Sequence, residues 1–139
     1  MRTVLHKIAV LLAAASYPLA GLAAPTCGAD LSGAQRMESA HYVLAYRTLP
    51  AKPLVGRHFA VEMVACPKGG APAPAGVAVD AYMPEHGHGM NYKAAVKPTG
   101  NAHYRAEGLM FHMPGRWDLI FELQSTGMTE RLTRSIVLQ

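Results

Sequence analysis

Histidines and methionines gather in two short stretches of the chain, where their side chains could bind a metal ion. Residues 83–90 read MPEHGHGM, so two imidazoles and two thioethers are separated by glycines that let the backbone fold closely around a small object. Residues 110–114 read MFHMP and add one imidazole and two thioethers. Thioethers together with imidazoles suit Cu(I) above all, while imidazoles with Glu85 could hold Cu(II) or Zn(II). The two stretches therefore predict a copper site.

His86 and His88 are the strongest candidate ligands. They lie two positions apart, so their rings reach the same side of an extended chain, and a glycine-rich loop gives them no core to fill. The alternative is that both are solvated loop histidines. Met83 and Met110 also have an alternative role, because each continues an apolar segment and could pack in the core. The predicted metal ligands are His86, His88, Met90, His112 and Met113, with Met83 and Met110 as candidates for completing the coordination sphere.

The remaining histidines and methionines beyond residue 23 are expected to be structural. His41, His58 and His103 each stand alone in a predicted strand, which is typical of a partly exposed strand residue. The methionines expected to pack or to lie on the surface are Met37, Met63 and Met128.

Alternating apolar and polar side chains run through most of the chain, with the period of a β-strand. Val77, Val79 and Ala81, for example, lie on one face of such a segment. Turn signals rich in proline and glycine, such as residues 50–53 and 67–76, separate the alternating segments. The predicted strands are residues 41–48, 58–66, 76–83, 91–97, 102–107, 116–124 and 129–138.

About seven short strands separated by such turns predict an all-β fold, an immunoglobulin-like antiparallel β-sandwich. A small closed barrel is the alternative. Residues 30–39 could hold a helical turn, and the sequence contains no repeat and no sign of a domain boundary.

The turn between two of these strands predicts that the two metal-binding stretches meet. If a hairpin turns about residues 99–100, Met90 lies opposite Leu109, and continuing the ladder brings His86 opposite Met113. A bulge at a nearby glycine would shift these pairs by a residue or two and still leave the stretches as neighbours. One shared site at one end of the sandwich is therefore expected.

The first 23 residues are predicted to be a secretory signal peptide. Arg2 and Lys7 give a positive start, residues 8–15 an apolar core, and small residues at positions 21 and 23 suit cleavage after Ala23. The apolar run is too short for a bilayer about 30 Å thick, so a retained membrane anchor is a weaker alternative, as is lipid modification of Cys27. The mature domain is then residues 24–139, periplasmic or secreted, without a stable membrane span.

Secretion favours a disulfide between Cys27 and Cys66, the two cysteines of the chain. Closing a loop of about 40 residues contributes about 4 kcal/mol in the chain-entropy model. A thiolate metal site is the alternative, and the absence of a C-x-x-C motif makes it weaker.

Composition and motifs exclude several classes of protein. With 139 residues, 50% hydrophobic and 16% charged, the chain is one small folded domain. Beyond residue 23, 11 Lys and Arg face 9 Asp and Glu with no basic run of five, so neither nucleic acid nor anionic lipid is an expected partner. No G-x-S-x-G, H-E-x-x-H or P-loop motif occurs, and we expect no enzymatic activity.

Three segments resemble the YtkA-like and FixH-like group of small exported domains. The sequence DAYMPEHGHGMN at residues 80–91 is followed by YRA at 104–106 and by LMFHMPGRWDL at 109–119. The resemblance covers roughly residues 53–138 and implies a periplasmic or membrane-tethered β-sandwich associated with copper handling or with assembly of copper-containing oxidases. Similarity to CopC-like copper carriers is more distant, because the expected mature N-terminus, Ala24, is not a histidine.

The expected function is that of a secreted or periplasmic copper-binding carrier or chaperone. It would hold Cu(I), or alternatively Cu(II), and pass the ion by ligand exchange to a periplasmic or membrane protein. The alternative is an immunoglobulin-like interaction module that binds no metal, for example in the assembly of a membrane oxidase, because methionine adapts well to protein-binding surfaces. Retention of copper by the purified protein would distinguish the two.

Overall fold

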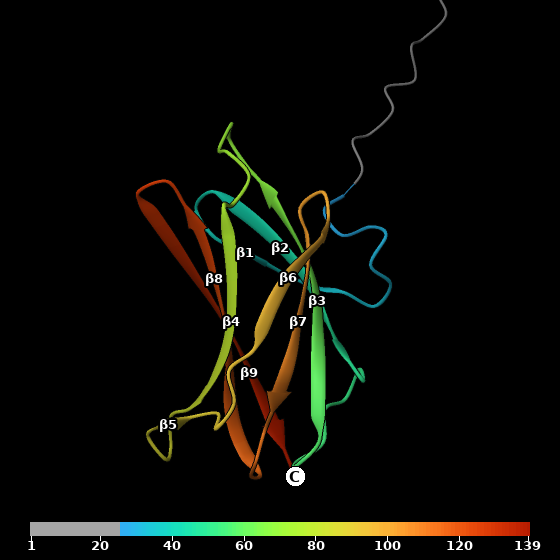
Figure 1. The fold of residues 1–139 in the computed structure, drawn as a ribbon, viewed down its shortest axis with the longest axis vertical. Helices are drawn as coiled ribbons and strands as arrows, with labels where there is room; N and C mark the ends of the chain where they lie inside the picture. Colours follow the sequence, from blue (N-terminus) through green and yellow to red (C-terminus); the bar gives the residue numbers. More distant parts are fainter. Residues whose placement is uncertain (1–25) are drawn as a thin grey trace, which may run out of the picture.

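The computed structural model describes residues 26–139, which form two antiparallel β-sheets packed face to face (Figure 1). Among these residues no helix is long and apolar enough to cross a membrane. The predicted signal peptide, residues 1–23, lies outside the described residues. The strands are β1 (Gln35–Glu38), β2 (Tyr42–Leu49), β3 (His58–Pro67), β4 (Gly76–Met83), β5 (His88–Gly89), β6 (Ala95–Gly100), β7 (His103–Met110), β8 (Gly115–Ser125) and β9 (Met128–Leu138).

The strand order confirms the predicted sandwich and makes the closed barrel wrong. One sheet has the order β1-β2-β3-β7-β6 and the other the order β5-β4-β8-β9. Without the short β1 and β5, this is the arrangement of the two sheets in a constant-type immunoglobulin domain. The helical turn considered for residues 30–39 is wrong, because Gln35–Glu38 pair with β2 and extend the first sheet.

The core lies between the sheets and is built from alternate residues of the strands. In β4, Val79, Ala81 and Met83 are buried, whereas the residues between them are exposed. Tyr46 of one sheet contacts Phe121 of the other, with ring centroids 4.8 Å apart. Such aromatic pairs add about 0.5 to 1.5 kcal/mol beyond the burial of their area.

The predicted hairpin register is wrong by three positions. Ala95 of β6 lies opposite Glu107 of β7, whereas a turn about residues 99–100 would place it opposite Tyr104. The chain turns later, at residues 101–102, where Ala102 adopts a left-handed φ of 57°. Before β6 the chain also leaves this sheet, because β5 pairs with β4 in the other one. Met90 and His86 are therefore not placed by a ladder along β7.

The segment before β1 is attached to the first sheet by a disulfide and by hydrogen bonds. The structure contains the predicted disulfide between Cys27 and Cys66, with Cα atoms 5.9 Å apart, so the thiolate metal site is wrong. Asp30 accepts a hydrogen bond from Nε2 of His103 at 2.7 Å. Hydrogen bonding to the Asn101 carbonyl, and then to Asp30, raises the pKa of His103, while His103 lowers the pKa of Asp30.

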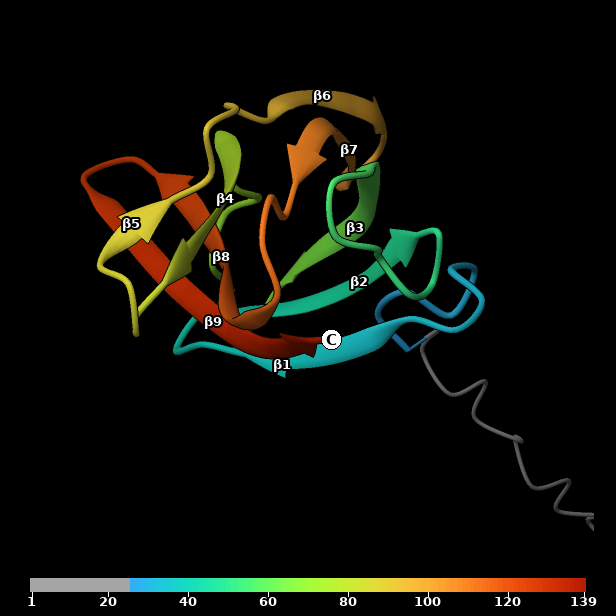
Figure 2. The ribbon, with the colours of Figure 1, turned by 90° about the horizontal axis from the view of Figure 1, so that it is seen from below.

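One flank of the sandwich is closed by contacts between strands of different sheets. Figure 2 shows β9 beside β1, and the guanidinium of Arg134 donates a hydrogen bond to the carbonyl of Arg36 at 3.2 Å. His41, just before β2, pairs with Glu130 of β9. Hydrogen bonding from Ser39, and then from His41, lowers the pKa of Glu130 to about 2.

Candidate functional site

The first histidine stretch forms a tight loop between β4 and β5. The carbonyl of Met83 accepts hydrogen bonds from the backbone N–H groups of His86, at 3.2 Å, and Gly87, at 2.9 Å. Gly87 has a φ of 69°, which a glycine adopts without strain, and the chain reverses there. β5 then runs back along β4 with His88 directly opposite Met83. Since the Met83 side chain is buried, this register turns the His88 side chain toward the inner face of the sheet.

The second histidine stretch connects β7 with β8 at the same end of the sandwich, the lower end in Figure 1. Trp117 of β8 fixes this connection by donating a hydrogen bond from Nε1 to the carbonyl of Met113 at 3.0 Å. Gly115 allows the connection to pass close to the side chain of Met83. Its φ is 122°, and a Cβ atom there would lie 3.0 Å from Cε of Met83. The two stretches are thus packed against each other.

Three imidazole rings from the two stretches gather above Trp117. The ring centroid of His88 lies 5.1 Å from that of His112 and 5.8 Å from that of His86. The Trp117 ring is 5.2 Å from His112 and 5.9 Å from His88. We call His86, His88 and His112 the imidazole cluster. It joins His112 to two histidines that lie 24 and 26 positions earlier in the sequence.

Two nitrogens in the imidazole cluster are not used in hydrogen bonds within the described residues. Nδ1 of His88 lies 3.1 Å from the carbonyl of Gly89, which can only accept, so Nδ1 carries a proton and, in the neutral ring, Nε2 holds the lone pair. Nδ1 of His112 is buried and has no hydrogen-bond partner among the described residues. A buried polar atom left unpaired costs about 1 to 3 kcal/mol. The site therefore carries an unsatisfied nitrogen beside a second imidazole.

The rings of the imidazole cluster are spaced suitably for a shared ion, but they are not oriented to bind one. Two imidazoles on one ion, with bonds of about 2.0 to 2.1 Å, have ring centroids about 5 to 6 Å apart, as these do. The rings of His88 and His112 are stacked, however, at an interplanar angle of 29°. Within residues 26–139, no three His, Cys, Asp or Glu side chains are arranged to hold a metal ion. Coordination of a shared ion would require the rings to reorient.

The predicted methionine ligands divide into three positions. Met83 is fully buried and packs in the core beneath the loop. Met90 and Met113 are half-buried and pack against the edge of the same core, each adjoining its own histidine stretch. Met110 lies elsewhere: it is opposite His58 on the β3–β7 ladder, and its neighbours Leu109 and Phe111 are the ones that enter the core.

Charged side chains hold the loop against β8. Arg116 lies 3.6 Å from Glu85 and 3.3 Å from Asp118, and Ser135 of β9 donates a hydrogen bond to Asp118 at 2.6 Å. Glu85 is thus engaged by a cation. The exposure of Arg116 and Glu85 limits the direct contribution of their pair to stability to about 1 kcal/mol or less.

Sequence reasoning missed the roles of Trp117 and His58. Trp117 forms the floor of the imidazole cluster, and the only signal for it was its place in the PGRW segment. His58 was expected to stand alone, yet its ring contacts Tyr92 with centroids 5.1 Å apart. The pairing of β3 with β7, which places His58 beside Met110, has no local sequence signal.

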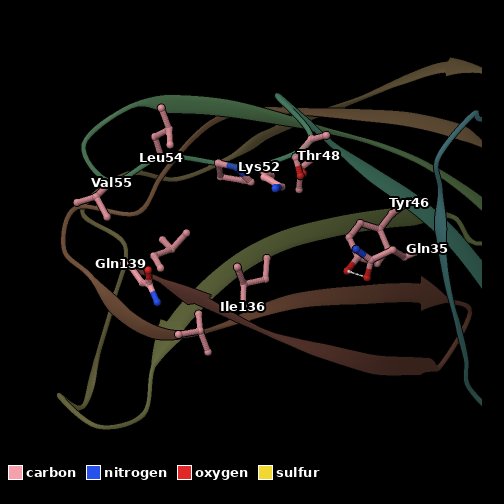
Figure 3. Close-up of a pocket in the computed structure, with 12 residues that line it drawn as sticks. Gln35, Tyr46, Thr48, Lys52, Leu54, Val55, Ile136 and Gln139 are labelled. Atoms are coloured by element: carbon pink, nitrogen blue, oxygen red, sulfur yellow. Dashed lines mark hydrogen bonds between the residues drawn. The ribbon is translucent and has the colours of Figure 1, made fainter.

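A groove lies away from the imidazole cluster, on the flank beside the end of β9 (Figure 3). It has a volume of about 610 Å³ and is lined mainly by apolar side chains, among them Tyr46, Leu54 and Ile136. No histidine or methionine lines it. The groove therefore offers no imidazole or thioether to a metal ion.

The chain is similar to a known protein family and to a solved structure. A family model described as YtkA-like matches residues 47–122, a segment that contains the whole imidazole cluster. No curated protein matches the chain. A similar solved structure is that of a DUF4426 family protein from Pseudomonas aeruginosa PAO1, with 16% sequence identity and a TM-score of 0.49, covering 77% of this chain and 97% of that one.

Proposed function

The chain belongs to the YtkA-like family, and we propose that it is an exported copper carrier or chaperone rather than an enzyme. The imidazole cluster would hold the ion as cargo, and a periplasmic or membrane protein would receive it. The disulfide between Cys27 and Cys66 supports export, because such bonds persist in oxidising compartments. The predicted signal peptide, residues 1–23, would direct the chain there.

The contact between His88 and His112 carries the proposal. It combines a ring separation of 5.1 Å with a lone pair on Nε2 of His88 and an unpartnered, buried Nδ1 on His112. A bond from that buried nitrogen to a metal ion would offset the cost of leaving it unpaired. His86 is exposed beside this pair and could complete the site or be displaced by a ligand of a recipient protein.

The donor types around the cluster favour Cu(I) over Zn(II). The thioethers adjoining the histidines, Met90 and Met113, are soft ligands, which select Cu(I). The nearest carboxylate in the loop, that of Glu85, is paired with Arg116, so a hard oxygen ligand is less available. Cu(II) bound by imidazoles alone is the second oxidation state to be tested.

An interaction module that binds no metal is the second candidate. It is favoured by the stacked orientation of His88 and His112 and by the exposed aromatic rings of Tyr82 and Tyr92 near the same loops. In that case the histidines and methionines would contact a partner protein, such as an assembly factor of a membrane oxidase.

Metal titration separates the two candidates. Cu(I), under anaerobic reducing conditions, and Cu(II) are titrated against the wild type, H86A/H88A and the control H41A/H103A, whose histidines are ion-paired elsewhere. We expect the first variant to lose at least about tenfold in affinity, since even outer partners of metal ligands are worth that much, and the control to keep wild-type affinity. Unchanged affinity of H86A/H88A would remove these residues from the site. Copurification of an assembly protein without retained copper would favour the interaction module.

A further inference from the structure

His58 and Met110 form a second imidazole and thioether pair outside the imidazole cluster. They are directly opposite partners on the antiparallel β3–β7 ladder. Side chains of opposite residues project to the same side of a sheet, with Cβ atoms about 4.5 to 5.5 Å apart. The next pair along the ladder, Phe59 and Leu109, is buried in the core. His58 and Met110 therefore project from the outer face of the sheet.

Among the described histidines outside the imidazole cluster, His58 has the fewest polar contacts. His41 and His103 each pair with a carboxylate, Glu130 and Asp30 respectively. Within residues 26–139, the ring of His58 has no hydrogen bond or ion pair, and its aromatic contact is an edge contact with Tyr92. His58 is exposed and Tyr92 is 45% exposed. The ring nitrogens of His58 are thus open to a ligand from solvent.

The pair lies next to the imidazole cluster along the chain. Met110 precedes His112 by two residues, so their Cα atoms are at most about 7 Å apart. Phe111 between them points into the core, which leaves Met110 on the outer face and His112 at the cluster. Met110 and His112 thus lie close together along the chain at the end of β7, which is the basis for proposing exchange between them.

We propose that His58 and Met110 are a second, exposed Cu(I) site, through which the ion enters or leaves the imidazole cluster. One imidazole and one thioether are donors that Cu(I) accepts, and two ligands leave room for a donor from a recipient protein. Copper stays Cu(I) throughout: the bond to a cluster nitrogen breaks as the bond to the Met110 sulfur forms, and no electron or proton is transferred. The exchange role rests on the proposed function, whereas the site itself does not.

Methyl NMR of ¹³C-labelled methionine tests the second site directly. Cu(I) is added anaerobically to wild type, to H86A/H88A and to H58A. We expect the Met110 methyl signal to shift in the first two proteins and to stay in place in H58A, while Met128, far from both sites on β9, serves as an internal control. A Met110 signal that does not move, or that moves equally in H58A, would overturn the second site.

Release kinetics test the exchange role. Copper-loaded wild type and the variants H58A and M110L are mixed with a small-molecule Cu(I) chelator, and we expect release at least threefold slower from both variants at equal initial loading. Equal rates would overturn the exchange role. If copper shifts the Met110 methyl signal but leaves the ring signals of His86, His88 and His112 unmoved, the imidazole cluster is not a copper site. The proposed function and the exchange role then fail, while the second site stands.

Discussion

A double-mutant cycle on His88 and His112 follows from their ring contact. If both rings bind one ion, H88A and H112A each remove one of its ligands and should lower Cu(I) affinity by about 10- to 100-fold, which is about 1.4 to 2.8 kcal/mol. Once one imidazole is lost the ion is held by fewer groups, so removing the second should cost less. We expect the loss of binding free energy in the double variant to be smaller than the sum of the two single losses by about 1 kcal/mol or more. Independent sites deviate from additivity by only roughly 0.5 kcal/mol.

Competition against a calibrated Cu(I) chelator gives the four affinities of this cycle. The fluorescence of Trp117, the single tryptophan of the chain, reports in parallel on the site, because its ring lies 5.2 Å from that of His112. H41A provides a matched control, since His41 is engaged by Glu130 on the flank beside β9. Strictly additive losses, with each single variant binding one ion less tightly, would refute the claim that the two histidines share an ion.

Four further expectations concern the fold. Replacing Cys27 and Cys66 by alanine should lower the free energy of unfolding by about 4 kcal/mol for the 39-residue separation, and urea titration of wild type and variant checks it. Gly115→Ala should cost about 1 to 3 kcal/mol, because a Cβ at a φ of 122° meets the buried methionine beneath it; unchanged thermal stability would contradict this. The pKa of His103 is raised in the folded protein, so its contribution to stability is full below about pH 6.5 and is lost as pH rises through the folded-state pKa. H103Q should therefore reduce the dependence of the free energy of unfolding on pH, measured between about pH 5 and 9. The pKa of Glu130 is lowered to about 2, so its contribution is present above about pH 4.5 and is lost as pH falls toward 2, and E130Q should weaken this acid dependence.

Local side-chain patterns were enough to predict the architecture. The alternation of Val79, Ala81 and Met83 with exposed residues is a direct consequence of burying one face of β4, so it is visible in the sequence. Two strands were missed because they are too short to show an alternating pattern: β5 has two residues and β1 has four. The helical turn expected for residues 30–39 failed because Gln35–Glu38 form β1 and pair with β2.

The sequence predicted that the two histidine stretches meet, but not the strand pairing that brings them together. The glycine-rich loop correctly marked His86 and His88 as neighbours, and His112 does lie against His88. The route was different from the predicted one, since a turn three positions off and a change of sheet at β5 replace the continuous ladder. Long-range pairing also moved Met110 from the cluster to His58, which no local pattern of residues could have indicated.

X-ray absorption at the copper edge of the loaded protein tests the central claim most directly, because it identifies the atoms bonded to the ion. Protein carrying one equivalent of Cu(I) should show at least two imidazole nitrogens and at least one sulfur around the metal, and the imidazole contribution should shrink in H86A/H88A. A first shell of oxygen atoms alone, or the same spectrum in that variant, would contradict the assignment of copper to the imidazole cluster.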